Sequence, residues 1–267
     1  MNFFCRQLNL FYLALSFFTR LPIPKNVQYS AALLNQSGRY FSLIGWVLAL
    51  ILSAAVFVFS TFFPSILVVA LIIILSLLLT GAFHEDGLAD MADGIGGGMT
   101  LEKRLTIMKD SRIGTYGSVS LVCSLGLKFI CLYLLAQFDY LILALIVAYP
   151  LSRALAASLI FDMRYVADLD TSKSKPLASN QTVTELLLLL MIGVAPVGLF
   201  YDAFSLSFFI YLSVCLLFFR WGFKTWLNAR IGGYTGDCLG AAQQIAEIVI
   251  YLVLIASFGL SMPEVTL

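Results

Sequence analysis

Residues 40–62 read YFSLIGWVLALILSAAVFVFSTF, and residues 64–83 read PSILVVALIIILSLLLTGAF. Neither stretch contains a charged residue, and each is about as long as the 20 or so residues that an α-helix needs to cross a bilayer core. Inside that core every backbone N–H and C=O group needs an internal partner, which a helix supplies. The two stretches therefore predict two transmembrane helices joined by a tight turn around Phe63.

Five further apolar runs are long enough to cross, at residues 116–137, 139–161, 185–201, 203–221 and 239–260. The N-terminal run Leu8–Phe18 is shorter, so we expect an interfacial or re-entrant helix there rather than another crossing. No small-x-small site follows it that would indicate a cleaved signal peptide. The predicted fold is one all-α polytopic membrane domain, residues 1–267, with about seven transmembrane helices as three hairpins plus one and a short N-terminal interfacial helix.

The composition agrees with a membrane protein. Of the 267 residues, 61% are hydrophobic and 12% are charged, with a mean hydropathy of +0.96, whereas a soluble domain is about 45–50% apolar and about 25% charged. The formal net charge of +1 gives no reason to expect a nucleic-acid partner. The five cysteines form no CxxC pair and are odd in number, so we expect reduced thiols used in packing.

The positions of Lys and Arg predict the orientation in the membrane. All of the 16 except Lys128 and Arg153 lie in residues 1–39, 84–115, 162–184 and 220–238. Cytoplasmic loops collect basic residues, so we expect these segments and the N-terminus on the cytoplasmic side, and the hairpin turns and C-terminus outside. Lys128 and Arg153 lie within predicted spans, where a charge costs at least about 2.5–3.5 kcal/mol. They either form interhelical ion pairs or bind an anion.

An acidic stretch, HEDGLADMADGIGGG, occupies residues 84–98. If it is helical, Asp86, Asp90 and Asp93 have the spacing i, i+4, i+7 and share one face. Such carboxylates repel one another unless a cation neutralises them, and hard oxygen ligands favour Mg²⁺ or Mn²⁺ over Zn²⁺. Since Mg²⁺ commonly binds substrate phosphates too, the stretch predicts phosphate chemistry. A solvated helix end and a purely structural cation site are the alternatives.

Glycine and basic residues nearby favour a phosphate site. Eight of the 19 glycines lie between residues 81 and 117, Gly97 among them, and glycine turns let backbone N–H groups approach a phosphate. Lys109 and Arg112, in KDSRIGTYG at 109–117, are suited to diphosphate oxygens. His84 is the single histidine. It is either a general base or a hydrogen-bonding residue at a helix end.

A second polar stretch, GGYTGDCLGAAQQIAE, occupies residues 232–247. Three of its glycines are spaced four residues apart, which is typical of closely packed membrane helices. Packing does not explain Asp237, Gln244 and Glu247, which on a helix fall within an arc of about 80° and reach two to three turns into the membrane. Polar side chains at that depth indicate an interior cavity.

The chain resembles the cobalamin synthase family, the adenosylcobinamide-GDP ribazoletransferases, over about residues 17–247. The resemblance lies in FFTRLPIP at 17–24, GRYF at 38–41, Lys128 and the three polar strings quoted above. It implies a Mg²⁺-dependent, or Mn²⁺-dependent, enzyme of the bacterial inner membrane. The enzyme would join adenosylcobinamide-GDP and α-ribazole, or its 5′-phosphate, to give adenosylcobalamin, or its phosphate, and GMP. The resemblance is compatible with an oligomer or with association with other cobamide-assembly enzymes.

The same resemblance implies roles for the polar residues. The metal would be held by Asp86, Asp90 and Asp93, with Glu85 and Asp237 as further ligands. His84 or a carboxylate would take the proton of the attacking hydroxyl. Lys109, Arg112 and Arg153 would stabilise the diphosphate together with Lys128, which would act as a catalytic residue, and Gly97, Asp237 and Gln244 would also bind the substrates.

Two other functions remain as alternatives. The acidic stretch is similar to that of CDP-alcohol phosphotransferases, but Asp90 stands where that family has an arginine and the later acids are out of register. A transporter or ion channel would use charges such as Lys128, Arg153 and Glu247 to line a pathway. The acids, however, cluster towards one predicted face rather than along a pore.

Overall fold

The computed structural model describes residues 2–167 and 179–259. These residues form eleven α-helices and two short 3₁₀ helices. Within the same ranges the β pairing is limited to a single bridge between Tyr165 and Tyr234. All five cysteines are free thiols. The predicted all-α class is therefore confirmed.

Each predicted span contains a helix, although the ends differ by a few residues; the helix in the predicted span 64–83, for example, ends at Thr80. Five helical segments are long and apolar enough to cross a membrane, and a sixth is obtained if α4 and α5 (Phe83–Gly97) are counted together. By themselves, α4 and α9 have 16 and 17 residues. Large apolar side chains such as Phe57 and Val122 are each 74% exposed on the outside, as contact with lipid requires. The helices at the predicted spans are α3 (Phe41–Phe59, continuing α2, Ala31–Ser37, and a 3₁₀ turn at Gly38–Tyr40), α4 (Ser65–Thr80), α7 (Thr115–Gln137), α8 (Leu141–Asp162), α9 (Val183–Leu199), α10 (Leu206–Ile231) and α11 (Gly236–Gly259).

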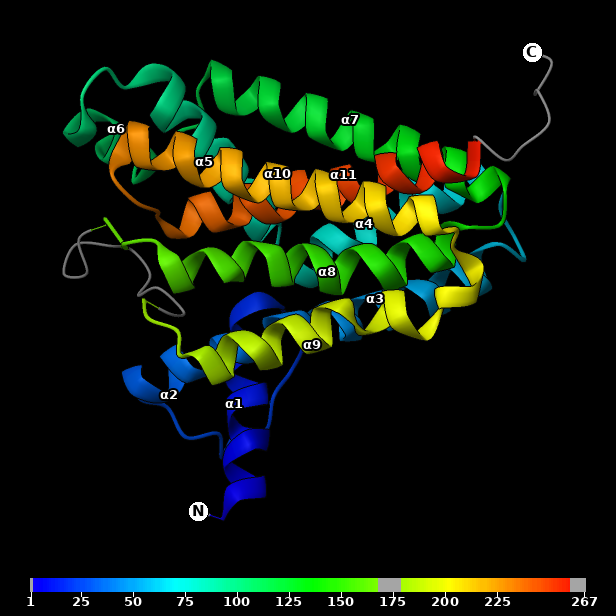
Figure 1. The fold of residues 1–267 in the computed structure, drawn as a ribbon, viewed down its shortest axis with the longest axis horizontal. Coiled ribbons are helices and arrows are strands. Elements are labelled where there is room, and N and C mark those ends of the chain that lie inside the picture. The colour runs from blue at the N-terminus through cyan, green and yellow to red at the C-terminus, as the bar shows by residue number, and fades with distance from the viewer. Residues whose placement is uncertain (1, 168–178, 260–267) are drawn as a thin grey trace.

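These helices run along a common direction and alternate in sense (Figure 1). The three short connections, at residues 60–64, 138–140 and 200–205, lie together at one end, and the basic segments lie at the other. Lys173, Lys175 and the C-terminal Leu267, which also entered the predicted orientation, lie outside the described residues.

The two helices of the third predicted hairpin, α9 and α10, lie next to each other only at their connection. Helix α9 packs on α8 and α3, whereas α10 packs on α11. Helix α8 is the centre of the bundle, because it also packs on α3 and α11 and is buried along most of its length. Neighbours in sequence are therefore not always partners in packing.

The N-terminal helix α1 (Phe3–Phe18) lies across the direction of the bundle (Figure 1). Its C-terminal end packs into the core through Leu15 and Phe18. Just beyond it, the Arg20 N–H donates to the Leu79 carbonyl of α4 at 2.7 Å. This orientation agrees with the predicted interfacial helix and brings residues 17 and 18 beside the start of α5.

A sharp break separates α4 from α5. The chain bends by 85° there, because Gly81 and Ala82 both adopt left-handed backbone conformations, with φ of 66° and 55°. Glycine favours this turn, because it adopts a positive φ without the strain that a side chain brings, and a Cβ at Gly81 would also displace the Arg20 side chain. The acidic stretch thus forms a separate helix, α5, which packs against α11, α7 and α6 (Leu101–Met108).

Candidate active site

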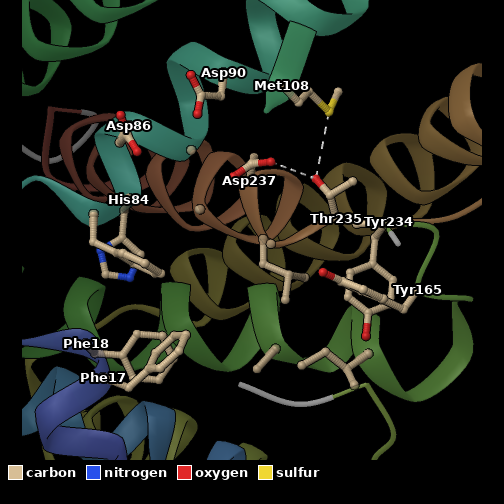
Figure 2. A pocket seen from close by; sticks show the side chains of 18 of the residues that line it. Phe17, Phe18, His84, Asp86, Asp90, Met108, Tyr165, Tyr234, Thr235 and Asp237 are labelled. Atoms are coloured by element: carbon tan, nitrogen blue, oxygen red, sulfur yellow. Dashed lines mark hydrogen bonds between the residues drawn. The ribbon is translucent and has the colours of Figure 1, made fainter. Parts of the chain in front are cut away.

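A cavity of about 290 Å³ lies at the end of the bundle that carries the basic segments (Figure 2). It is walled by the end of α1, the first turns of α5 and α11, and one side of α8. Gly38, Phe41 and the segments 108–111, 165–167 and 234–235 complete it. Residues more than 200 positions apart in sequence therefore meet at one site.

Four aspartates line this cavity: Asp86 and Asp90 from α5, Asp237 from the first turn of α11, and Asp110, which forms an ion pair with Arg112. The two helices approach closely because Gly87 and Gly240 face each other. A Cβ on Gly87 would lie 3.0 Å from the Asp237 carbonyl oxygen, and one on Gly240 would lie 3.1 Å from that of His84. The close crossing brings Asp86 within electrostatic reach of Asp237. The glycine spacing in the second polar stretch thus serves packing at Gly240.

The carboxylate set suits a hard divalent cation only with help from a ligand. Among the described residues, no group of three or more His, Cys, Asp or Glu side chains is close enough to hold a metal ion unaided. Magnesium typically binds one or two carboxylates and completes its shell with water and substrate phosphate oxygens. Acids that converge on one cavity without forming a closed cage fit that pattern.

Thr235 orients Asp237, and sequence reasoning gave it no role. Its hydroxyl donates to Asp237 Oδ2 at 3.2 Å and accepts from the Cys238 N–H at 3.4 Å (Figure 2). The hydroxyl therefore caps the first turn of α11 while fixing the carboxylate. The signal was present in the string GGYTGD, where a threonine two residues before an acid precedes an apolar run.

The predicted cations separate into two groups. Lys109 lines the cavity. The side chain of Arg112 is 87% exposed and forms an ion pair with Asp110 at 2.6 Å. The hydrogen bonds that Arg112 donates to the Asp110 carboxylate, and then the negative charge of that carboxylate, raise the pKa of Arg112. Gly97, at the far end of α5, does not line the cavity either.

Asp93 points away from the other two acids of its stretch. Its carboxylate oxygens accept the N–H groups of Gly114 at 2.6 Å and Gly117 at 2.8 Å, and the residue is buried. It thereby satisfies backbone donors at the beginning of α7, which lack partners within the helix. The structure brings Asp86, Asp90 and Asp237 together at the cavity. Asp93 instead binds backbone N–H groups at the beginning of α7.

A second set of predicted site residues forms a closed cluster between α5, α7 and α11. Lys128 Nζ donates to Gln244 Oε1 at 2.7 Å and lies 3.2 Å from Glu247 Oε1 and 3.8 Å from Glu85 Oε1. All four side chains are buried, and none lines the cavity. Of the two interpretations of Lys128, interhelical ion pairing is the one that this geometry supports.

Arg153 extends this cluster on α8. It is 2% exposed and donates from Nη1 to the Tyr149 carbonyl at 2.9 Å. Its guanidinium lies over the Tyr149 ring, 4.9 Å from the centroid, and over the Phe41 ring at 5.7 Å. Two cations, Lys128 and Arg153, thus accompany two carboxylates, Glu85 and Glu247. The resulting network, hereafter the buried charge cluster, is formally neutral.

His84 is the one polar member of an aromatic wall that sequence reasoning did not find. Its ring is stacked 6.0 Å from Phe18 and 5.6 Å from Phe41. It is 2% exposed, and its Nε2 has no hydrogen-bond partner among the described residues. Phe17 and Phe83 complete the wall, and all five residues line the cavity. The sequence signals for this wall were FFTRLPIP, which contains Phe17 and Phe18, and GRYF, which contains Phe41.

The opposite end of the cavity is closed by Tyr165 and Tyr234. Their rings meet edge to face with centroids 5.4 Å apart, and the backbone joins them through Val166 N–H to Tyr234 O and Tyr234 N–H to Arg164 O. A Cβ on Gly233 would lie only 2.0 Å from Arg164 O, so glycine permits this bridge.

Fold and site together define a multi-pass membrane protein whose acid-lined cavity opens at one end of its helical bundle. The chain belongs to a known family of this kind: the model of the cobalamin-5-phosphate synthases matches residues 10–255. The predicted family is therefore confirmed.

Curated relatives carry the name adenosylcobinamide-GDP ribazoletransferase. One from Vibrio vulnificus (strain YJ016) is 57% identical over 251 residues, which cover 94% of this chain and 96% of the relative. One from Vibrio parahaemolyticus is 55% identical, with 94% of both chains covered. One from Shewanella woodyi is 48% identical, covering 94% of this chain and 96% of the relative. No solved structure matches the chain.

Proposed function

We propose that this chain joins adenosylcobinamide-GDP to α-ribazole, or to its 5′-phosphate, and releases GMP. The observation that carries the proposal is the meeting of Asp86, Asp90, Asp237 and Lys109 in one cavity, in a chain whose curated relatives bear the name of that transferase. Phosphoryl transfer needs such a site, because its catalysis rests on positioning and on balancing the phosphate charge.

In the proposed reaction, a ribose hydroxyl attacks the phosphorus nearer to the cobinamide. A new P–O bond forms, the bond between that phosphorus and the bridging oxygen breaks, and the electron pair leaves with GMP. Lys109 would bind the diphosphate and stabilise the charge that develops on GMP. His84, buried at the cavity with Nε2 unpartnered, would accept the hydroxyl proton.

A bound divalent cation would complete this site. Mg²⁺, or Mn²⁺ in its place, would be held by Asp86, Asp90 and Asp237 together with diphosphate oxygens, and would neutralise the negative charge of the leaving group. Asp93 and Glu85 stay candidates from sequence, although Asp93 is engaged with two backbone N–H groups. The substrate-binding roles of Arg112, Lys128, Arg153, Gly97 and Gln244 stand only as sequence-based predictions.

We also propose that the cavity opens to the cytoplasm of a bacterium with this protein in its inner membrane. The basic segments at its end of the bundle support this orientation. A transporter is less well supported, because Lys128 and Glu247 form an ion pair within the buried charge cluster and Arg153 is buried beside them.

The test is GMP release by the full chain purified in lipid nanodiscs, supplied with adenosylcobinamide-GDP, α-ribazole and Mg²⁺. We expect GMP and cobalamin in equal amounts, and none when α-ribazole is left out. Loss of activity in EDTA and its return with Mg²⁺ would support the metal. If folded protein released no GMP from intact substrates, the proposed transferase activity would be refuted. If turnover were undiminished in EDTA, only the proposed role of the divalent cation would be refuted.

A further inference from the structure

The cavity has two chemically different ends with carboxylates between them (Figure 2). At one end lies the aromatic wall, formed by Phe17, Phe18, Phe41, Phe83 and His84. At the other lie Tyr165 and Tyr234, hereafter the tyrosine pair. Asp237 lies between the two ends, and Asp86 and Asp90 lie along the same side (Figure 2).

The aromatic wall is apolar except for His84. Phe18 is stacked on Phe41 with centroids 3.8 Å apart, and Phe83 meets Phe17 edge to face at 5.4 Å. The guanidinium of Arg153 packs against the Phe41 ring, 5.7 Å from its centroid. Phe83 is 37% exposed at the cavity. Such a surface favours a flat, apolar ring, because stacking on an aromatic side chain is worth about 1–3 kcal/mol per base and needs no hydrogen-bonding edge.

The tyrosine pair differs in polarity. Each of its rings carries a hydroxyl group, and Thr235 follows Tyr234 directly. The bridge between residues 164–166 and Tyr234 pairs the main-chain groups of this end with one another, so the polar character of this end comes from its side-chain hydroxyl groups. A base with polar edges is better matched to this end than to the aromatic wall, because polar groups buried against phenylalanine would lose their hydrogen bonds to water.

We infer that the aromatic wall binds the benzimidazole base of the ribazole nucleoside, and that the guanine of the second substrate lies towards the tyrosine pair. The inference rests on the proposed function and specifies its two base-binding sites. In-line displacement at phosphorus puts the attacking hydroxyl and the leaving group on opposite sides of that atom. The nucleoside that attacks and the GMP that leaves must therefore extend in opposite directions from the carboxylates, as the two ends of the cavity do.

The test separates the two substrates kinetically. In Phe83→Leu, we expect the KM for α-ribazole to rise about tenfold, because the stacking surface is lost, while kcat and the KM for adenosylcobinamide-GDP stay within about twofold of wild type. Phe17→Leu should act in the same direction, and guards against a folding defect peculiar to one position. Tyr165→Leu should instead raise the KM for adenosylcobinamide-GDP. Phe62→Leu, at an exposed ring in a hairpin turn remote from the cavity, is the matched control.

Binding of α-ribazole alone, measured by calorimetry on the same nanodisc samples, should weaken in Phe83→Leu and not in Tyr165→Leu. The inference is overturned if Phe83→Leu and Phe17→Leu leave the KM for α-ribazole unchanged, raise both KM values equally, or act on adenosylcobinamide-GDP instead. In each of these cases GMP release by the wild type would still stand, so the assignment of the two ends would fail while the proposed function survived. Absence of GMP release by the wild type would remove both.

Discussion

Glu85 and Asp86 are neighbours on α5, yet they belong to two charged regions of opposite character. Glu85 points to Lys128 and joins the buried charge cluster, in which two cations accompany two carboxylates. Asp86 faces the cavity with Asp90 and Asp237, where the lining residues include more acids than bases. Successive residues on a helix point about 100° apart, so one short helix can serve both regions. In the buried charge cluster, the two cations balance the two carboxylates within the protein. In the cavity, the excess negative charge of the aspartates is suited to be balanced by a bound cation and a ligand.

Among substitutions that test this difference between the two charged regions, we expect the largest effect on activity at Asp86. Asp86→Asn should lower kcat for GMP release by at least about a hundredfold, which is the usual scale for removing one group that stabilises developing charge. Thermal stability without metal should stay the same or rise, because the repulsion between Asp86 and Asp237 is relieved. The assays are GMP release and a melting curve in nanodiscs.

The matched control for that experiment is Asp202→Asn, the same change at an acid in the 3₁₀ turn at the opposite end of the bundle. It should leave turnover unaltered. Near-normal turnover in Asp86→Asn would remove the cavity acids from the chemistry and with them the contrast between the two regions.

The next effect is on stability and concerns the buried charge cluster. Lys128→Ala should cost about 3–5 kcal/mol of unfolding free energy, because it leaves Glu85 and Glu247 buried without their common cation. The specific activity of the remaining folded protein should change little. Thermal denaturation followed by the loss of helical circular dichroism measures this.

A second substitution in the cluster gives a sharper test. Lys128→Met combined with Glu247→Gln removes one charge of each sign, so the pair should be more stable than Lys128→Met alone, with a coupling of at least about 1 kcal/mol. If Lys128→Ala folded normally and instead weakened binding of adenosylcobinamide-GDP, Lys128 would belong to the substrate site.

A smaller effect is expected at Asp93, which lies further along α5 and contacts the beginning of α7. Asp93→Asn should cost about 1–3 kcal/mol, because one of the N–H groups of Gly114 and Gly117 loses its acceptor. Faster hydrogen exchange at these two amides would report it. Unchanged exchange together with lost Mg²⁺ binding would instead make Asp93 a metal ligand.

The smallest perturbation tests which side of the membrane each region faces. A reporter enzyme fused after Leu267 should be found outside the cytoplasm, because α11 runs from the cavity end to the end that carries the hairpin turns. A fusion after Thr100, in a basic segment, should stay inside. The reversed pattern would put the cavity on the outer face.

Much of the fold could be predicted from the sequence because lipid imposes a simple rule: long apolar runs such as 41–59 must be helical. The break at Gly81 and Ala82 was harder to find, since an alanine with φ of 55° has no local signal. The pairing of α10 with α11 rather than α9 depends on side-chain packing between distant segments. In the site, Asp86, Asp90, Asp237, Lys109 and His84 were all predicted and all line the cavity.

The sequence by itself determined the class of protein, the end of the bundle that carries the polar segments, and the residue types available for chemistry. It did so because hydrophobic length, charge placement and the quoted strings are local properties of the chain. Only the tertiary structure decided which charges are paired and which face the cavity. Lys128, Arg153, Gln244 and Glu247 come together from three helices, while Phe17, Phe41 and His84 form a wall from three separate segments. Long-range packing sets such distances, because a side chain's partner depends on which helix lies opposite it.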